Sequence, residues 1–243
     1  MICGGCFLDL QYQFVTVTMT EPGIYYPHEL GTDQLDAFLE KGWYRMGQGI
    51  FTTQYIVQQD EVYRVWWLRY ALKHWTLSVA SKKIKKINRH FTVEIVPMHI
   101  NEAIETLYSQ YRSQLDFEPA ISVQHWLYDI ADKNIYDSWL IQIKDGEQLI
   151  AAGIFDNGLF SIAGIMNFYH PAYKKYSLGK YMMLLKMEYA LANGKHWYYP
   201  GYIVQHYPKF DYKLFAGKHA AQIFIPEFNR WVWWSDDLLP GME

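Results

Sequence analysis

The segment from residue 177 to residue 213 constrains the fold more than any other part of the chain. Ser177 is a typical helix N-cap, and Gly194 supplies a left-handed stop. Between them, apolar residues recur at intervals of three and four: Leu178, Tyr181, Met182, Leu185 and Tyr189. Apolar residues also fill most of the remaining face, so we expect a central helix covered on both sides. The charged positions expected to face water are Lys180, Lys186 and Glu188.

An aromatic and β-branched run follows this helix and is predicted as a strand from His196 to Val204. A Pro-Gly pair interrupts the run, which indicates a bulge or a close approach of the backbone. Two strands are predicted upstream, at 148–155 and 158–168, because Asp156-Asn157-Gly158 is a strong hairpin signal. Asp156 and Asp211 are both interpreted as turn residues. The order is therefore strand, tight turn, strand, polar loop, buried helix and strand.

This order is similar to that of GNAT-type acyltransferases, in which a helix N-terminus presents backbone N–H groups to the phosphates of a donor. A coenzyme A user of that fold carries several glycines in the loop before the helix. Here residues 173–179 contain only Gly179, which is too few for the backbone to wrap a pyrophosphate. The predicted fold class is α+β: a GNAT-like acyltransferase core, with a mixed, mostly antiparallel sheet and flanking helices, plus a smaller N-terminal α/β domain.

The same part of the chain carries a family resemblance. Its motifs are Pro171 and Tyr173, Ser177-Leu178-Gly179 with Tyr181, Tyr198-Tyr199, Gly201-Tyr202-Ile203, and Pro208-Lys209 with Tyr212-Lys213. Together they resemble the C-terminal domain of the arginyl-tRNA:protein transferases and of their bacterial leucyl-transferring relatives. Two positions depart from the family pattern, because Phe210 stands where Met is usual and Asp211 where a basic or small residue is usual.

A dense basic run at 81–90 marks a change of composition, and we place a domain boundary there. Residues 1–80 are predicted as the N-terminal domain, 81–90 as a basic linker and 91–243 as the catalytic domain. The run is a candidate seat for tRNA phosphates, because clustered Lys and Arg gain affinity through counterion release. A solvated linker is the alternative.

The remaining elements follow from periodicity and capping signals. They are a helix from near Thr32, strands at 50–57, 62–71 and 92–96, helices at 99–112 and from Ser122, and a hairpin of 138–143 with 148–155.

The sequence around Gly42-Trp43-Tyr44-Arg45 resembles that of the N-terminal domain of the same family. Arg45 is a candidate for holding the acidic N-terminal side chain of a protein substrate, since a guanidinium matches a carboxylate. The alternative is a solvated Arg at the start of a strand.

The resemblance implies transfer of an aminoacyl group from a tRNA ester to a protein N-terminal amine. That reaction is aminolysis of an activated ester, and an α-amine with a pKa of about 7.7–8.0 is partly free at cellular pH. Backbone donors at a bulge in the 158–168 strand are expected to hold the oxyanion. The candidate catalytic residues are Tyr202, His206 and Tyr212, which would pass a proton, and Lys213, which would face a phosphate or the oxyanion. The candidate substrate-binding residues are Arg45, Lys175, Ser177, Gly179, Lys180, Tyr181, Gly201 and Lys209.

Cys3 and Cys6 form a single C-x-x-C near the start of the chain. Two thiolates cannot complete a tetrahedral zinc or iron–sulfur site, although the resemblance implies N-terminal cysteines that bind a metal or cluster. A site would need His28, His74 or His90, or a second chain. Free or redox-active thiols are the alternative, and the reaction itself requires no cofactor.

The predicted function is aminoacyl-tRNA:protein transfer, in which Arg or Leu is added to N-terminal Asp or Glu and marks the protein for degradation. The alternatives are an acyl-CoA-dependent N-acyltransferase and a non-catalytic binder of tRNA or peptide.

The net charge of −3 argues against general nucleic-acid binding. The 21 Tyr and ten Trp predict core and rim packing, with a minority stacking on a 3′-terminal adenosine. Low cysteine usage and the lack of a signal-peptide layout or a membrane-spanning run predict a cytoplasmic protein without a membrane partner. The donor amino acid and the oligomeric state stay open.

Overall fold

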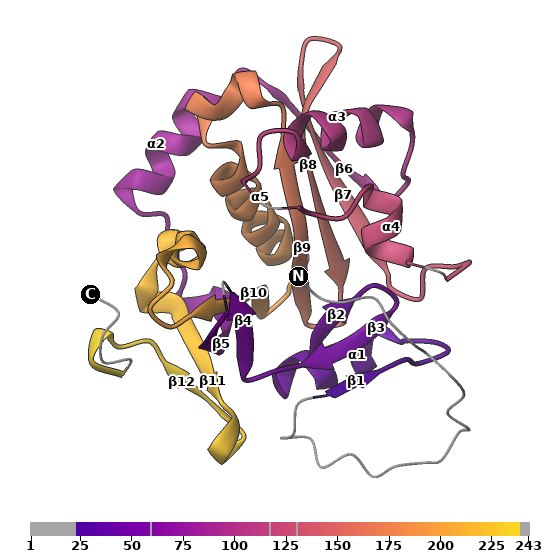
Figure 1. Ribbon diagram of the computed structural model, residues 1–243. Helices are drawn as coiled ribbons and strands as arrows, with labels where there is room; N and C mark the ends of the chain where they lie inside the picture. The colour runs from indigo at the N-terminus through magenta and orange to yellow at the C-terminus, as the bar shows by residue number, and fades with distance from the viewer. Residues whose placement is uncertain (1–22, 59, 117, 130, 239–243) are drawn as a thin grey trace.

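The computed structural model describes residues 23–58, 60–116, 118–129 and 131–238, and most of its strands form one large sheet (Figure 1). These strands are β4 (Tyr55–Gln58), β5 (Glu61–Ala71), β6 (Thr92–Pro97), β7 (Ser138–Asp145), β8 (Gln148–Asn157), β9 (Ser161–Tyr169), β10 (Trp197–Val204), β11 (Ala221–Ile225) and β12 (Arg230–Trp233). The order is β12-β11-β5-β10-β9-β8-β7-β6, and β4 pairs with β5. Every pairing in this sheet is antiparallel except that of β9 with β10. The predicted α+β class with a mixed, mostly antiparallel sheet is confirmed.

A small antiparallel sheet packs against the large one. It consists of β1 (Gly23–Tyr25), β3 (Gly49–Thr52) and β2 (Tyr44–Met46), in that order, with helix α1 (Thr32–Glu40) beside it. Helix α1 buries Leu35 and Leu39 in a cluster with Trp67 of β5, Tyr199 of β10 and Phe224 of β11. The small sheet is therefore fixed to the middle of the large sheet by a shared core.

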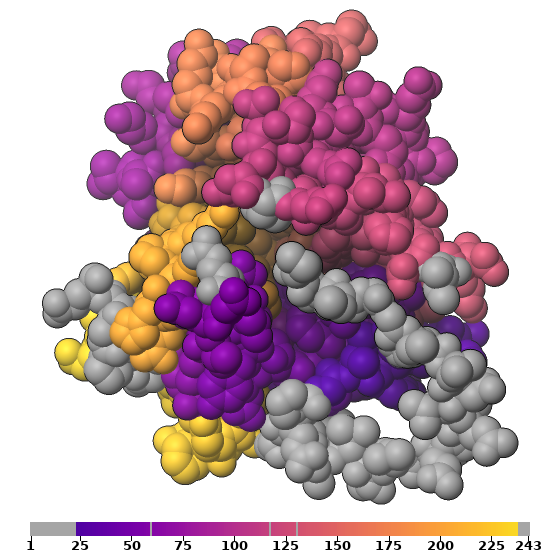
Figure 2. Space-filling view, in the orientation of Figure 1, coloured from indigo at the N-terminus to yellow at the C-terminus, as the bar shows by residue number. Residues whose placement is uncertain are grey.

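Helices cover both faces of the large sheet. Ile141 and Ile143 of β7 pack in the cluster of α5 (Leu178–Ala192), whereas Leu140 packs with α3 (Glu102–Arg112) and α4 (Val123–Tyr128). Because successive residues of a strand point to opposite faces, α5 and the pair α3–α4 lie on opposite sides. Helix α2 (Val79–Asn88) lies beside α5 and next to the 3₁₀ segment η2 (Pro171–Tyr176), as Figures 1 and 2 show. A second 3₁₀ segment, η3 (Pro208–Ala216), follows β10.

The predicted domain division at 81–90 does not match this architecture. Most of the basic run lies in helix α2, so it is not a linker. Ser81, Ile84 and Asn88 face inward at helical spacing, and the two buried polar residues among them hide the amphipathic pattern. In addition, β5 from the predicted N-terminal domain hydrogen-bonds to β10 and β11 within the large sheet.

The predicted course of α5 is confirmed, but the reason for its start is not. Gly194 has φ +68° and follows the end of the helix, as expected for a left-handed stop. Ser177 occupies the N-cap with φ +54° and ψ +43°, and its side chain makes no capping hydrogen bond. The expected single strand at 50–57 is also interrupted, because β3 ends at Thr52 and β4 begins at Tyr55. None of the helices in the described part of the chain has the length and apolar composition that crossing a bilayer requires.

Candidate active site

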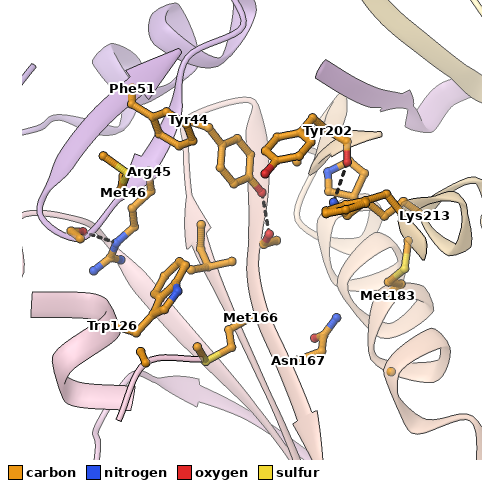
Figure 3. Close-up of a pocket in the computed structure, with 18 of the residues that line it drawn as sticks. Tyr44, Arg45, Met46, Phe51, Trp126, Met166, Asn167, Met183, Tyr202 and Lys213 are labelled. Atoms are coloured by element: carbon orange, nitrogen blue, oxygen red, sulfur yellow. Dashed lines mark hydrogen bonds between the residues drawn. The ribbon is translucent and has the colours of Figure 1, made fainter. Parts of the chain in front are cut away.

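The site lies where strands β9 and β10 part. Trp197, Tyr198 and Tyr199 of β10 pair with residues 161–163 of β9, and the two strands share no further pairs. Beyond this point a pocket of about 1300 Å³ opens beside both strands (Figure 3). Beyond this point, the backbone groups of β9 and β10 no longer serve as ladder partners for each other.

A bulge in β9 lies on the pocket wall. Gly164 pairs with Phe155 of β8 and Met166 pairs with Ile154, so Ile165 is an extra residue without a pair in either neighbouring strand. The bulge predicted for the 158–168 strand is thus confirmed, and residues 164–167 line the pocket. Gly164 is also a close approach, since a Cβ there would lie 2.6 Å from the hydroxyl of Tyr198.

The predicted irregularity of β10 is confirmed as well. The register against β5 shifts between Tyr198 and Gly201, and Gly201 has φ +95°, which L side chains rarely adopt. A Cβ at Gly201 would meet the Nζ atom of Lys213 at 3.5 Å. The Pro-Gly interruption therefore lets the strand pass close to a buried amine.

Tyr44 of β2 closes the gap between the parted strands. Its hydroxyl lies 2.5 Å from the carbonyl oxygen of Gly164 and 2.9 Å from that of Tyr199, and its single proton is donated to one of them at a time. Burial raises the pKa of this phenol well above its usual value, so it stays a neutral donor. No local sequence pattern points to this role of Tyr44, because the two contacts join residues far apart in the chain.

Lys213 of η3 is a buried amine that faces the pocket (Figure 3). Its Nζ donates to the carbonyl oxygen of Tyr202 at 2.6 Å and lies 5.0 Å and 4.9 Å from the ring centroids of Tyr202 and Phe210. No carboxylate of the described residues forms an ion pair with it. Burial lowers the pKa of the Lys213 ammonium to about 7, so the group can both accept and donate a proton near neutral pH.

Lys186 forms hydrogen bonds to residues next to the bulge. It is fully buried on α5, and its ammonium donates to the carbonyl oxygen of Ile154 at 2.7 Å, to Oδ1 of Asn167 at 2.9 Å and to the carbonyl oxygen of Met166 at 3.2 Å. The expectation that Lys186 faces water is therefore wrong. Ile154 and Met166 are the pair next to the extra residue, Ile165. Lys186 thus fixes the backbone on both sides of the bulge.

Arg45 lies in the pocket wall, but its guanidinium is fully used within the protein. Its five N–H donors bond to Asp156, Ser138 and Asn134 side chains and to the carbonyl oxygens of Gly47 and Leu127. The predicted role as a clamp for a substrate carboxylate does not fit this geometry, and neither does a solvated Arg. Asp156 is likewise not a turn residue, because β8 extends through it and buries it as the ion-pair partner of Arg45 at 2.9 Å.

The structure divides the remaining predicted residues into two groups. Those that line the pocket are Ser177, Gly179, Lys180, Gly201, Tyr202, Tyr212 and Lys213. Four residues lie outside the pocket. His206 is exposed, and Lys209 pairs with Asp116 at 2.8 Å. Tyr181 is buried in the core, and Lys174 lines the pocket in place of its neighbour Lys175. Spacing along η2, η3 and α5 could not show which residues of each segment turn inward.

The predicted metal ligands Cys3 and Cys6 lie outside the described residues, so that prediction stays open. Within the part of the chain that is described, no group of three or more His, Cys, Asp and Glu side chains is arranged to hold a metal ion.

Aromatic side chains form much of the pocket wall: Tyr26, Tyr44, Phe51, Trp67, Tyr111, Trp126, Tyr128, Tyr169, Tyr198, Tyr202, Phe210 and Tyr212. In Figure 3, Tyr44 and Tyr202 lie on the opposite side of the pocket from Trp126 and Met166. A wall of this kind offers flat, apolar surfaces that suit a planar ring.

Comparisons with known proteins agree with the motifs in the sequence. Residues 103–220 match the family model described as arginine-tRNA-protein transferase, C terminus. The aspartate/glutamate leucyltransferase of Shewanella sp. (strain MR-7) is 28% identical over 165 residues, which cover 66% of this chain and 67% of that protein. The enzyme of the same description from Leptospira interrogans is 22% identical over 220 residues, or 85% of this chain and 81% of that protein.

Among solved structures, FemX is similar with a TM-score of 0.43 and 11% identity, covering 75% of this chain and 64% of its own. L-PGS from Bacillus licheniformis has a TM-score of 0.39 and 12% identity, covering 57% of this chain and 48% of its own. The family match extends over the pocket-forming elements from α3 to η3. Residues 103–220 are thus similar to the C-terminal part of the arginine-tRNA-protein transferases.

Proposed function

We propose that this protein is an aminoacyl-tRNA:protein transferase that moves an aminoacyl group from a charged tRNA to the N-terminal amine of proteins beginning with Asp or Glu. The observation that carries the proposal is the buried amine of Lys213 in a pocket that the backbone bulge of β9 also lines. The match of residues 103–220 to the family model supports the reaction class, and the description of the relatives as aspartate/glutamate leucyltransferases supports acidic acceptors. The residue that is added would mark the acceptor for degradation.

We also propose that the fold is of the GNAT acyltransferase type. In support, α5 connects β9 to β10, these strands form the single parallel pair of the large sheet as described, and they part at the pocket. Separated strands leave room between β9 and β10 at a position where an acyl group and an attacking amine can meet.

In the proposed reaction, the acceptor amine attacks the ester carbonyl of the aminoacyl-tRNA, and a tetrahedral oxyanion forms. Backbone N–H groups at the Ile165 bulge would stabilise the oxyanion, since preorganised donors act strongly where water is excluded. The neutral amine of Lys213 takes the proton from the attacking nitrogen. Collapse of the intermediate breaks the bond to the ribose oxygen, and Lys213 returns the proton to that oxygen. Atoms and charge balance, and no cofactor takes part.

The pocket offers places for the 3′ end of the tRNA. Aromatic residues such as Trp126 and Tyr169 would stack on the terminal adenine, at roughly 1–3 kcal/mol per base. Lys174 and Lys180 line the pocket near the start of α5 and would face either the terminal phosphates or the acidic side chain of the acceptor. Positioning both reactants can account for roughly 7–11 kcal/mol of the barrier.

The chemistry of the wall favours leucine over arginine as the donor residue. Met46, Met166 and Met183 line the pocket, and Asp129 is the single acidic residue among the described residues that do so. An arginyl side chain would require carboxylate partners, whereas flexible thioethers adapt to a branched apolar side chain.

The test incubates the protein with leucyl-tRNA or arginyl-tRNA and peptides beginning with Asp, Glu or Ala, and follows peptide mass. We expect one leucine on the acidic peptides alone. Modification with arginine would overturn the donor assignment. If acyl-CoA in place of tRNA gives an acylated peptide, the protein is an ordinary N-acyltransferase. Binding of tRNA and peptide without product from either donor would identify a non-catalytic relative.

Replacement of Lys186 by Met tests the bulge independently of the reacting groups. The change leaves three buried acceptors without their donor, so we expect a loss of about 1–3 kcal/mol in the free energy of unfolding. Because the bulge would be less rigid, kcat for transfer should fall while KM for both substrates stays the same. Urea unfolding and steady-state kinetics measure the two effects. A variant that loses stability but keeps its kcat would show that Lys186 supports only the core.

A further inference from the structure

Helix α2 and segment η2 present a surface rich in unpaired cations. Lys82, Lys83, Lys86 and Arg89 of the α2 region are exposed, as are Lys174 and Lys175 of η2. Hereafter these six residues are called the α2 surface. The surface is notable because the whole chain carries a net charge of −3.

The cations of the α2 surface differ in their partners from Lys85 beside them. Lys85, on the same helix, pairs with Glu188 of α5. Among the described residues, no carboxylate forms an ion pair with any of the six cations. The field of the surface is therefore not neutralised within the protein.

The α2 surface is rigidly attached next to the pocket. Asn88 of α2 donates to the carbonyl oxygens of Ile84 and Tyr176, and the second bond fixes the helix to η2. The segment η2 leads directly into α5, and Lys174 both belongs to the surface and lines the pocket. Figure 2 shows α2 and η2 side by side on one face of the molecule. A ligand that enters the pocket with one end would therefore lie over α2 with its adjoining part.

We infer that the α2 surface binds the backbone phosphates of the tRNA acceptor stem while the 3′ end occupies the pocket. The inference rests on the proposed function, because it takes the donor to be a charged tRNA. A duplex stem carries phosphates at regular intervals and gains affinity from clustered Lys and Arg without a sequence requirement. The positively charged α2 surface beside an apolar pocket fits a molecule with a negatively charged body and a single-stranded reactive end.

Other polyanions fit the surface less well. A membrane-binding helix presents bulky apolar side chains along one face, but Ile84 of α2 packs against the core and Val79 is the one large apolar side chain that the helix exposes in the described residues. Sequence-independent recognition of phosphate needs no such apolar face.

The decisive experiment compares two triple variants that remove the same charge. One is Lys82→Gln, Lys83→Gln and Lys86→Gln on the α2 surface. The control is Lys41→Gln, Lys133→Gln and Arg230→Gln, which lie directly after α1, after α4 and on β12, away from α2 in Figure 1. Both are assayed with full-length aminoacyl-tRNA and with a 3′-terminal aminoacyl-adenosine as the donor, and both are titrated with uncharged tRNA at several salt concentrations.

For the α2 variant we expect KM for aminoacyl-tRNA to rise roughly tenfold or more near 0.1 M salt, with kcat unchanged. The logarithmic salt dependence of tRNA binding should become shallower by about one for each cation removed. KM for aminoacyl-adenosine should stay the same, because this donor does not reach α2. The control variant should behave like the wild-type protein with both donors.

Three results would overturn the inference: equal loss with the short donor, equal loss in the control variant, or unchanged tRNA binding by the α2 variant. Because uncharged tRNA is titrated directly, the surface is tested even if the protein transfers nothing. In that case, salt-dependent binding lost only in the α2 variant would support the surface and reject the transferase. Vesicles of phosphatidylserine are tested in the same way. If the α2 variant loses binding to the vesicles but keeps binding to tRNA, and the control variant binds both, the α2 surface is a membrane surface instead.

Discussion

Replacement of Lys213 by Met is expected to lower kcat for aminoacyl transfer by roughly 10²–10⁴-fold, the contribution that a positioned acid–base group typically makes. The variant keeps a side chain of similar volume among the rings of Tyr202 and Phe210 but removes the amine that would move the proton. Removal of a buried cation without a carboxylate partner offsets the loss of its hydrogen bond to the carbonyl oxygen of Tyr202, so stability should change little. Single-turnover kinetics and thermal unfolding measure the two outcomes together.

The pH dependence identifies how Lys213 acts. Its pKa of about 7 means that the neutral, proton-accepting form grows as the pH rises through 7, so kcat of the wild-type protein should increase there. The acceptor amine titrates separately, at about 7.7–8.0. In Lys213→Met, the increase of kcat near pH 7 should vanish, whereas the increase caused by the acceptor amine should remain. Lys213→Arg should not restore activity, because a guanidinium stays charged.

Lys209→Met is the matched control for this prediction, since Lys209 lies on the same segment, η3, at the exposed surface next to Asp116. Its kcat should equal that of the wild-type protein. A similar loss in both variants would show that η3 as a whole, and not the amine of Lys213, is needed. A Lys213→Met variant with normal kcat would remove Lys213 from the mechanism and leave the positioning of the reactants as the main source of catalysis.

Patterns within single segments could predict most of the fold. The apolar spacing after Ser177 located α5, and the Pro-Gly interruption located the irregularity of β10 beside Lys213. Local signals of this kind depend on the backbone and on neighbouring residues, which the sequence lists directly. They also placed Tyr202, Tyr212 and Lys213 near one another, because all follow the same strand within a short distance.

Contacts between distant segments could not be predicted in the same way. In the sequence, Lys186 cannot be distinguished from a lysine on a solvated helix face. Its acceptors, the carbonyl oxygens of Ile154 and Met166, lie in other segments of the chain. Asp156 precedes Asn-Gly and therefore looks like a turn residue, yet β8 continues through it to reach Arg45. In each case the energetics of burial depend on a partner elsewhere in the chain, which neither composition nor periodicity encodes.

The ion pair of Arg45 and Asp156 gives the largest expected effect on stability. It joins β2 of the small sheet to β8 of the large sheet, and both side chains are fully buried. Arg45→Met would leave the Asp156 carboxylate without its cation, which is expected to lower the free energy of unfolding by about 3–5 kcal/mol. In the double variant Arg45→Met with Asp156→Leu, neither charge is buried, so most of that loss should be recovered. Chemical unfolding of the two single variants and the double variant measures the coupling.

The sign of the pH dependence separates this explanation from simple loss of packing. Burial raises the pKa of Asp156, and Arg45 opposes that effect, so removal of Arg45 should raise the folded-state pKa further above the unfolded value of about 3.9. Between these two pKa values the folded state then holds a proton that the unfolded state has released, and stability must fall as the pH increases. Arg45→Met should therefore be less destabilised at pH 5 than at pH 7, whereas the double variant should show the same deficit at both. If the Arg45→Met deficit is independent of pH, the guanidinium contributes through packing and its hydrogen bonds to Ser138, Asn134 and Leu127, not through the charge of Asp156.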